Sequence, residues 1–330
     1  MLNIQKNVKL SEYSTFKIGG EAKEFVEVKN EKEFLEVINY VKENNLKFFI
    51  LGGGSNVLFD DRGFEGIIIK ISAPSPRRAQ QGGPALGWQD TSLEFWAGYS
   101  LSSLVNFARD NNLTGLEWAV GIPGTIGGAV RGNAGAFGGA MADVIAEVKA
   151  YDTSELKVVN YELKNCDFGY RDSIFKKNPE LVIVSAKIKL EKGDKEKIKE
   201  KMKEILKKRS IKQPKDWIGS AGSFFKNPIV EDEKLRKKFS AQGGPASGWE
   251  KKMKSRISDK RISAGWLIEE AGLKGEKFGN ISVSDTNANF LINSGSGTME
   301  EVLMAASIIK QKIRDKFGIE IQEEAKIVYY

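Results

Sequence analysis

Apolar residues recur along the first part of the chain with two different periods, and each period predicts a type of element. Short apolar runs at 24–28, 47–51 and 66–71 predict strands. Between the first two runs, Asn30 has the character of a helix N-cap, with Glu33 three residues on. The buried face of that helix is then Phe34, Val37, Ile38 and Val41. This β-α-β order predicts a small α/β unit.

The same patterns predict the rest of the elements. Further strands are expected over 93–97, 144–151, 156–161, 181–190, 288–293 and 324–329, and further helices over 101–111, 195–208 and 264–271. The helix over 195–208 is expected to bury Ile198, Met202, Ile205 and Leu206. A capping box at Thr298 and Glu301 begins the last helix, and Gly318 ends it. Its expected buried face is Val302, Ala306, Ile309, Ile313 and Phe317.

Two segments, roughly 72–91 and 239–255, change in character and have the composition of inserted loops. They contain the near-repeats AQQGGPALGW and AQGGPASGW. Two copies are too few for a repeat architecture, so we interpret them as a pair of exposed loops. The chain of 330 residues is long enough for two or three domains.

Two glycine-rich stretches carry the main chemical signal. They are LGGGSNVLFDD (51–61) and GIPGTIGGAVRGNAGAFGG (121–139). Glycine lets the backbone approach a ligand closely, and successive exposed amides form a concave surface that suits a phosphate or diphosphate. Either stretch alone is equally consistent with tight turns and close packing. Together they suggest one large phosphate-bearing cofactor held from two sides, although neither fits the P-loop or the GxGxxG fingerprint.

Composition excludes several classes of chemistry. The sequence has no histidine and one cysteine, Cys166. Triads with histidine, histidine metal ligands and a histidyl-linked flavin are therefore excluded, no metal is expected, and we interpret Cys166 as a structural thiol. The net charge is +7, but lysines alternate with glutamates over 191–210, which favours a solvated helix face over a nucleic-acid surface. We find no membrane span and no secretory signal, and we expect a cytoplasmic protein.

A series of motifs runs along the chain: STFKIGG (14–20), LGGGSNVLF (51–59), GIPGTIGGAV with NAGAFGG (121–139), FGYRDSIFK (168–176), GSAGSFFKNP (219–228), SAGWLIEEAGLKG (263–275), ANFLIN (288–293) and GIEIQEEAKIV (318–328). Taken in order, these motifs resemble those of the UDP-N-acetylenolpyruvoylglucosamine reductase family of flavoenzymes. Each motif alone is weak, but the ordered set is specific and covers nearly the whole chain outside the two insert-like segments. The similarity is closer to the shorter, type II form of the family.

The resemblance implies an α+β fold. Its N-terminal half would be an FAD-binding domain of the PCMH or vanillyl-alcohol-oxidase type, built from two α/β subdomains. We expect the first subdomain over 1–75, joined by the C-terminal strand 319–330, and the second over 76–210. A C-terminal α+β substrate-binding domain would cover 211–318.

The resemblance also implies a reaction. NADPH reduces non-covalently bound FAD, the flavin N5 hydride passes to C3 of the enolpyruvyl group of UDP-N-acetylglucosamine enolpyruvate, and C2 is protonated, which gives UDP-N-acetylmuramate for peptidoglycan. Arg171 matches the catalytic arginine, Ser223 the proton donor and Glu324 the C-terminal glutamate, with Glu323 left open as the alternative. The expected flavin contacts are Gly52, Gly53, Gly54, Ser55, Asn56, Gly121, Ile122, Gly124, Thr125, Gly127 and Gly128.

Residues for the phosphates of the UDP-sugar and NADPH follow from the same motifs. They are Tyr170, Arg209, Lys212, Asn227 and Asn287. Asn287 stands where the family has histidine or glutamine, so that position can hydrogen-bond but cannot titrate. Arg131 and Gly132 replace the usual aliphatic-methionine pair, which affects local packing near the flavin. We expect a monomer with no nucleic-acid or membrane partner.

Two other functions stay open at this point. An FAD-dependent hydroxyacid or sugar-alcohol oxidase would share the glycine loops, but it has no reason to carry GSAGSFFKNP or the terminal glutamate. A non-catalytic nucleotide-binding protein would share the loops and none of the chemistry. The response of the absorption spectrum to NADPH distinguishes the three.

Overall fold

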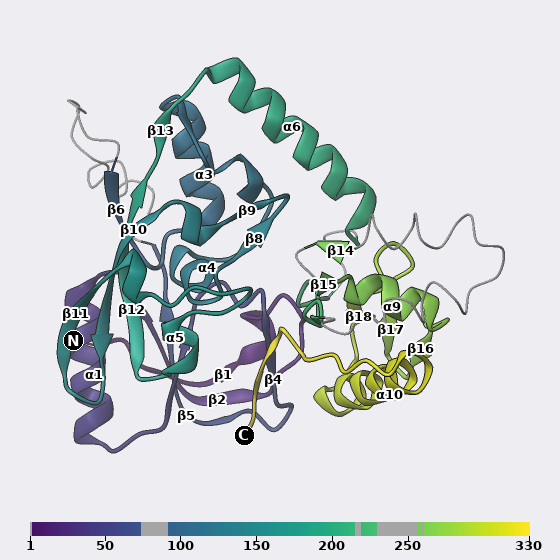
Figure 1. Cartoon of the computed structure of the whole chain (residues 1–330). Helices are drawn as coiled ribbons and strands as arrows, with labels where there is room; N and C mark the ends of the chain where they lie inside the picture. The colour runs from purple at the N-terminus through teal and green to yellow at the C-terminus, as the bar shows by residue number, and fades with distance from the viewer. Residues whose placement is uncertain (1, 74–91, 215–218, 230–256, 259–260) are drawn as a thin grey trace. The chain divides into compact units, whose positions relative to one another are not determined.

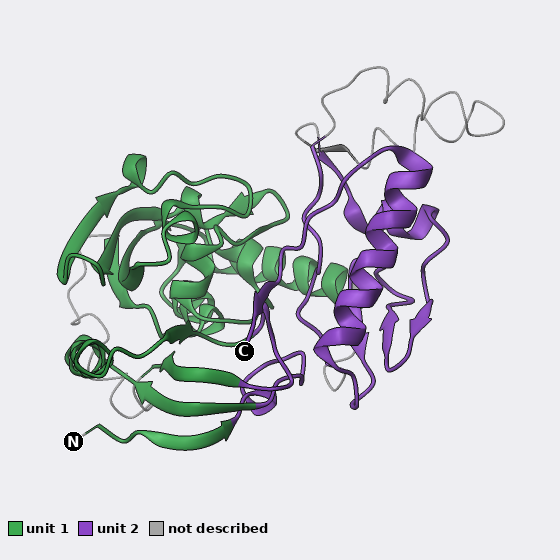
Figure 2. Ribbon diagram, turned by 90° about the horizontal axis from the view of Figure 1, so that it is seen from below, with its two compact units in different colours: residues 1–8, 21–54, 64–211 green, residues 9–20, 55–63, 212–330 purple. Residues whose placement is uncertain are grey.

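The structure is a computed structural model that describes residues 2–73, 92–214, 219–229, 257–258 and 261–330 (Figure 1). The insert-like segments, apart from Ser72 and Ala73, lie outside these residues. The chain divides into two compact units, shown in green and purple in Figure 2. Unit 1 comprises 1–8, 21–54 and 64–211, and unit 2 comprises 9–20, 55–63 and 212–330.

The first sheet of unit 1 has the strand order β1 (Gln5–Lys9), β2 (Glu21–Val28), β5 (Phe64–Ile71), β3 (Phe48–Leu51). Strands β2 and β3 both pair with β5 in parallel, as expected when a helix connects strands of one sheet. That helix, α1 (Glu31–Glu43), begins where the Asn30 side chain accepts a hydrogen bond from the Glu33 amide. Its buried residues are the four predicted ones, Phe34, Val37, Ile38 and Val41, so the β-α-β start is confirmed.

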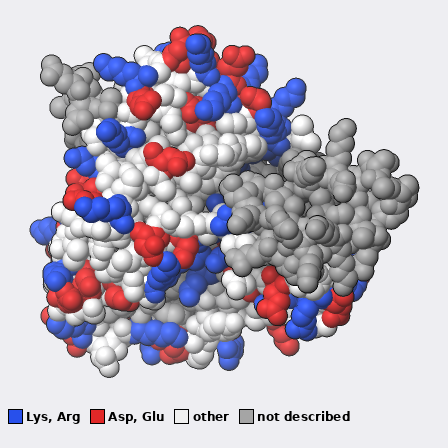
Figure 3. Space-filling view, viewed as in Figure 1, with Lys and Arg blue, Asp and Glu red and all other residues white. Residues whose placement is uncertain are grey.

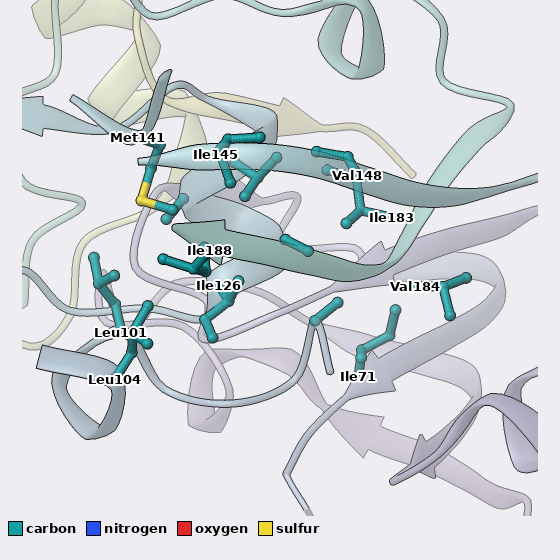
Figure 4. Packing of buried hydrophobic residues seen from close by; sticks show 14 of the residues in the cluster. Ile71, Leu101, Leu104, Ile126, Met141, Ile145, Val148, Ile183, Val184 and Ile188 are labelled. Atoms are coloured by element: carbon teal, nitrogen blue, oxygen red, sulfur yellow. The ribbon is translucent and has the colours of Figure 1, made fainter. Parts of the chain in front are cut away.

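The second sheet of unit 1 is antiparallel, in the order β11 (Lys157–Glu162), β10 (Ile145–Asp152), β12 (Leu181–Lys189), β6 (Ser92–Trp96). Helix α4 (Ile126–Arg131) contacts strands β12 and β6 of this sheet, and helix α3 (Leu101–Asp110) belongs to the same unit. Figure 4 shows Ile71 of the first sheet near Val184 of the second, and both belong to one buried hydrophobic cluster. Because the two sheets share a core, the division into subdomains near residue 75 stays a prediction.

Helix α6 (Lys195–Lys212) closes unit 1. Ile198, Met202 and Ile205 are buried as predicted, but Leu206 is 46% exposed, so its predicted burial was wrong. The helix buries only a narrow stripe, and Leu206 lies about 100° around the helix from Ile205. Figure 3 shows acidic and basic side chains interspersed over the viewed face.

Unit 2 contains helices α9 (Ala264–Glu270) and α10 (Met299–Phe317) and the antiparallel strands β16 (Lys277–Phe278), β17 (Ile281–Val283) and β18 (Leu291–Asn293). The capping box of α10 is present, and Gly318 ends the helix at φ +68°. Its predicted buried face is confirmed: Val302, Ala306, Ile309, Ile313 and Phe317. Strand β19 (Lys326–Val328) pairs in parallel with β4 (Val57–Phe59). The C-terminal strand thus joins a segment of 1–75, and both partners belong to unit 2.

The remaining elements are short. They are β7 (Leu113–Thr114), β8 (Gly135–Ala136), β9 (Gly139–Ala140), α5 (Ile174–Lys177), β13 (Glu191–Lys192), β14 (Ile257–Ser258), β15 (Arg261–Ile262) and 3₁₀ turns at Leu10–Glu12, Glu117–Ala119, Met141–Asp143 and Leu163–Asn165. Within the described ranges, no helix has the length and apolar composition that crossing a membrane requires.

Candidate active site

The two glycine loops of unit 1 pack directly against each other. A Cβ atom on Gly52 would lie 2.5 Å from Thr125 Oγ1, and one on Gly53 would lie 2.8 Å from Gly124 Cα. Both separations are shorter than side-chain carbons tolerate, so this approach depends on glycine in the first loop. The loop after β3 and the loop before α4 therefore form one continuous backbone surface.

The amides of these loops fall into two groups. Those of Ile122 and Gly127 donate to the carbonyl oxygens of Ala119 (3.0 Å) and Ala97 (2.9 Å), and that of Gly128 donates to Thr125 Oγ1 (3.3 Å). These three N–H groups are therefore used in hydrogen bonds within the protein. By contrast, no acceptor among the described residues is found for the amides of Gly52, Gly53, Gly124 and Thr125. These four N–H groups, contributed by both loops, are the donors suited to a diphosphate.

Arg209, on α6, lies beside the second loop. A Cβ atom on Gly121, whose φ is +75°, would lie 3.3 Å from Arg209 Cδ. The guanidinium carbon is 5.6 Å from the centre of the Phe137 ring, and the buried Nε has no hydrogen-bond partner among the described residues. Burial lowers the pKa of this guanidinium from its usual value. A cation with an unmet donor next to Gly121 suits an anionic ligand.

Arg171 lies in a tight turn of unit 1. The turn is closed by the Gly169 amide, which donates to the Asp172 carbonyl oxygen at 3.0 Å. Arg171 has φ +55°, and its Nη2 donates to the Gly135 carbonyl oxygen at 2.8 Å. The Arg171 guanidinium also lies 5.3 Å from the centre of the Tyr170 ring. Two predicted site residues, Tyr170 and Arg171, are thus brought next to the NAGA segment of the second glycine stretch.

Ser223 and Glu324 lie on neighbouring segments of unit 2. Ser223 forms a β-bridge with Phe290, and Phe225 forms one with Glu323. The Glu324 amide donates to the Phe224 carbonyl oxygen at 2.7 Å, which joins the predicted glutamate to the residue after the predicted proton donor.

Glu323, the alternative to Glu324 as the catalytic glutamate, has a lysine partner. Glu323, with 26% of its side chain exposed, forms an ion pair with Lys310 of α10 at 3.0 Å. A carboxylate held by a lysine has a structural use already. The ion pair gives Glu323 a structural role, and Glu324 as the catalytic glutamate stays a proposal.

Two other predicted ligand residues, Asn227 and Asn287, accept hydrogen bonds from backbone amides. Asn227 Oδ1 accepts from the Ala264 amide (2.9 Å), and Asn287 Oδ1 accepts from the Asn289 amide (3.2 Å). Asn56 Nδ2 donates to the Glu324 carbonyl oxygen at 3.2 Å, so this side chain braces the C-terminal segment. Gly54 has φ +65°, and Ser55 follows it at the start of a unit 2 segment. Lys212 ends α6, and its side chain lies outside the described residues.

Sequence reasoning missed the asparagines that brace this backbone. Asn289 is buried, and its side-chain amide both accepts from the Phe225 N–H (3.0 Å) and donates to the Phe225 carbonyl (2.8 Å). Asn133, in NAGA, is buried in the same way in unit 1. The available signal was an asparagine inside an otherwise apolar motif, because a buried amide requires partners.

Cys166 is buried, and its thiol faces the carbonyl oxygens of Tyr161 and Glu162 at 3.7 and 3.4 Å. Burial raises the pKa of the thiol to about 11. A thiol that stays protonated is a poor nucleophile, in keeping with a structural role.

Comparisons with known proteins match both halves of the chain. The sequence model described as UDP-N-acetylenolpyruvoylglucosamine reductase, C-terminal domain, matches residues 213–328, and that of an FAD binding domain matches residues 22–159. A protein of Caldanaerobacter subterraneus named UDP-N-acetylenolpyruvoylglucosamine reductase is 37% identical over 324 residues, which cover 98% of this chain and 92% of the relative. A protein of the same name from Solibacter usitatus is 32% identical over 327 residues, 99% of this chain and 97% of the relative.

A solved structure has the same fold. The crystal structure of UDP-N-acetylenolpyruvylglucosamine reductase from Thermus caldophilus aligns with a TM-score of 0.72 at 27% identity, covering 99% of each chain. Since relatives more than 30% identical match over nearly their full length, the chain belongs to the UDP-N-acetylenolpyruvoylglucosamine reductase family.

Proposed function

We propose that this protein reduces UDP-N-acetylglucosamine enolpyruvate to UDP-N-acetylmuramate with NADPH, as an FAD enzyme of peptidoglycan precursor synthesis. Family membership supports the reaction and the cofactor. The observation that carries the proposal from the structure is the packing of Gly52 and Gly53 on Thr125 and Gly124. That packing leaves four amides from two loops available to one diphosphate.

The residues present fit FAD at this place. Gly52, Gly53, Gly124 and Thr125 would hold the diphosphate through main-chain N–H groups. Arg209, predicted from the sequence as a ligand of the UDP-sugar or NADPH phosphates, lies beside Gly121, so we propose that its guanidinium adds a positive charge to this diphosphate site instead. For Ile122, Gly127 and Gly128 the amides are already used, so their contribution would be close approach of the backbone. Bound FAD accepts a hydride from NADPH and supplies one to the enolpyruvyl double bond.

The chain's own residues would then stabilise the negative charge on the substrate and supply the proton that C2 receives. Hydride addition at C3 leaves negative charge spread over C2 and the carboxylate of the substrate. Arg171 would bind that carboxylate through its planar guanidinium, and it would stabilise the enolate more than the ground state. The Ser223 hydroxyl would give its proton to C2, since an enolate is a strong base. Glu324 would assist as an acid, and Tyr170, Lys212, Asn227 and Asn287 would contact the UDP-sugar or NADPH phosphates.

One titration tests the function. Purified protein is expected to show a flavin spectrum that bleaches on anaerobic addition of NADPH and returns on addition of the enolpyruvyl sugar. An oxidase of the same cofactor fold would instead bleach with a hydroxyacid or sugar alcohol. Protein that neither carries nor binds FAD would contradict both enzymatic functions.

Further predictions concern the oligomeric state, location and partners of the protein. We propose a monomer in the cytoplasm that binds neither nucleic acid nor membranes. Sedimentation velocity with and without FAD measures the first, and a dimer that persists at low micromolar concentration would contradict it.

A further inference from the structure

Arg171 has a backbone conformation that needs support. Its φ of +55° lies in the left-handed region, which is unfavourable for a non-glycine residue. Such a conformation persists only where neighbouring contacts hold it, and it is common at functional sites. The turn's own hydrogen bonds run between Gly169 and Asp172 at 3.0 and 3.3 Å, and further contacts reach the turn from two other segments.

The first contact comes from Asn133, which is 8% exposed. Its Nδ2 donates to the Gly169 carbonyl oxygen at 2.8 Å, and its Oδ1 accepts from the Ala142 amide at 3.0 Å. Both ends of the side-chain amide are therefore engaged. A buried side chain with donor and acceptor both satisfied fixes the backbone that it touches. Asn133 thus ties the start of the Arg171 turn to the segment that follows α4.

The second contact comes from α5, directly after the turn. Lys176 Nζ donates to the carbonyl oxygen of Arg171 itself at 2.9 Å. Ser173, which is fully buried, donates from Oγ to the Arg131 carbonyl oxygen at 2.7 Å. The turn is therefore held before, at and after Arg171.

The Arg171 guanidinium contacts the same segment, 133–135, that contains Asn133. Arg171 Nη2 donates to the carbonyl oxygen of Gly135, two residues after Asn133. A shift of the turn relative to 133–135 would move the guanidinium from this contact. Misplacement of a catalytic group by about 1 Å can slow a reaction about 10²-fold.

We propose that Asn133 and Lys176 are positioning residues that hold the Arg171 guanidinium in place for the substrate carboxylate. The inference rests on the role of Arg171 under the proposed function. In this inference Asn133 fixes the start of the turn and Lys176 fixes the Arg171 carbonyl. Neither residue needs to touch the substrate.

The test separates the two half-reactions by anaerobic stopped-flow absorbance of the FAD-loaded protein. Asn133→Ala and Lys176→Met should leave flavin reduction by NADPH within about threefold of the unsubstituted protein. They should slow flavin reoxidation by the enolpyruvyl sugar about 10²-fold and about 10-fold respectively. Lys176→Arg, which keeps a donor on a long side chain, should restore most of the lost rate. Lys164→Met removes an exposed lysine that pairs with Glu162 and not with the turn, and is the matched control.

A second readout does not depend on turnover. The affinity for UDP-N-acetylmuramate, measured by calorimetry, should fall in Asn133→Ala and Lys176→Met and stay unchanged in Lys164→Met. If Asn133→Ala does not fold, Lys176→Met and Lys176→Arg decide the matter alone.

The outcomes distinguish this inference from the proposed function. If the unsubstituted protein is not reduced by NADPH or not reoxidised by the enolpyruvyl sugar, the proposed function fails. If it does both, equal slowing of the two half-reactions, or unchanged reoxidation with unchanged product affinity, would overturn the positioning role.

Discussion

The amide of Glu324 donates a hydrogen bond to the carbonyl oxygen of Phe224 at 2.7 Å, which connects the C-terminal segment to the residue after Ser223. On the same segment, Glu323 forms an ion pair with Lys310. Glu323 thus has a partner in α10, and substitution of each glutamate by glutamine should separate their roles.

Glu324→Gln should slow reoxidation of reduced flavin by about 10²-fold, because an amide cannot act as an acid. Glu323→Gln should leave that rate nearly unchanged and lower the free energy of unfolding by at most about 1 kcal/mol, through loss of a partly exposed ion pair. Stopped-flow absorbance and urea unfolding measure the two effects. The reverse pattern would assign the chemistry to Glu323.

Arg171→Lys should harm chiefly the same half-reaction. An ammonium keeps the charge but loses the planar guanidinium that pairs with a carboxylate through two parallel bonds, and it also loses the Nη2 contact with Gly135. We expect reoxidation to slow by about 10²- to 10³-fold, and reduction by NADPH to change little. Arg109→Lys, at an arginine paired with its neighbour Asp110, is the control. A loss of equal size in that variant would mean that the effect is not local.

Gly53→Ala should weaken FAD binding. Its Cβ would lie 2.8 Å from Gly124 Cα, a backbone atom that cannot move aside without opening the loop contact. Overpacking of this kind costs about 1–3 kcal/mol, so the dissociation constant should rise by about 5- to 150-fold. At Gly132 an added Cβ would meet only the Gly128 carbonyl oxygen, at an ordinary 3.5 Å, and Gly132→Ala should bind FAD normally. Fluorescence titration measures both, and normal binding by Gly53→Ala would contradict the loop geometry.

Asp60 should make stability depend on pH. Hydrogen bonds from Arg62, and from the Tyr330 amide, lower the pKa of the Asp60 carboxyl from 3.8 to about 2. The folded state therefore favours the charged form, and this stabilisation is present above pH 3.8 and is lost as the pH falls toward about 2.

Asp60→Asn should lower the free energy of unfolding by about 1–2 kcal/mol at pH 6. Water screens this interaction, because the Arg62 side chain is 69% exposed, and the effect is therefore smaller than the pKa shift alone implies. Urea unfolding at pH 6 and pH 3 should show the difference between the two proteins shrinking in acid. A difference that does not change with pH would contradict the assignment.

Elements with a local signal were predictable from the sequence. Asn30 with Glu33, and Thr298 with Glu301, mark the starts of α1 and α10, and the buried faces of both helices follow the apolar spacing. Helix α4 was not predicted because glycine is a poor helix former. There, Gly127 is required for another reason, since an added Cβ would lie 2.9 Å from the Ala97 side chain. Tertiary packing overrides propensity at this point.

The parts of the site that depend on distant contacts could not be read from local pattern. The motifs placed Arg171, Ser223 and Glu324 as candidates, but nothing in their spacing predicts φ +55° at Arg171 or the Asn133 bond to Gly169. Likewise, Glu323 and Glu324 are equivalent in sequence until α10 brings Lys310 to one of them. These contacts join residues 13 and 36 positions apart in the chain, which local pattern does not encode.

The most direct test of the central claim, that Ser223 protonates C2 of the substrate after hydride transfer, is the stopped-flow comparison of Ser223→Ala with the unsubstituted protein. The control is Ser294→Ala, at an exposed hydroxyl elsewhere in unit 2 that donates to the Asn280 carbonyl. We predict that reduction by NADPH stays nearly intact, while reoxidation by the enolpyruvyl sugar slows by about 10³- to 10⁶-fold, equivalent to about 4–8 kcal/mol. Equal slowing of both half-reactions, or reoxidation at the normal rate, would contradict the account.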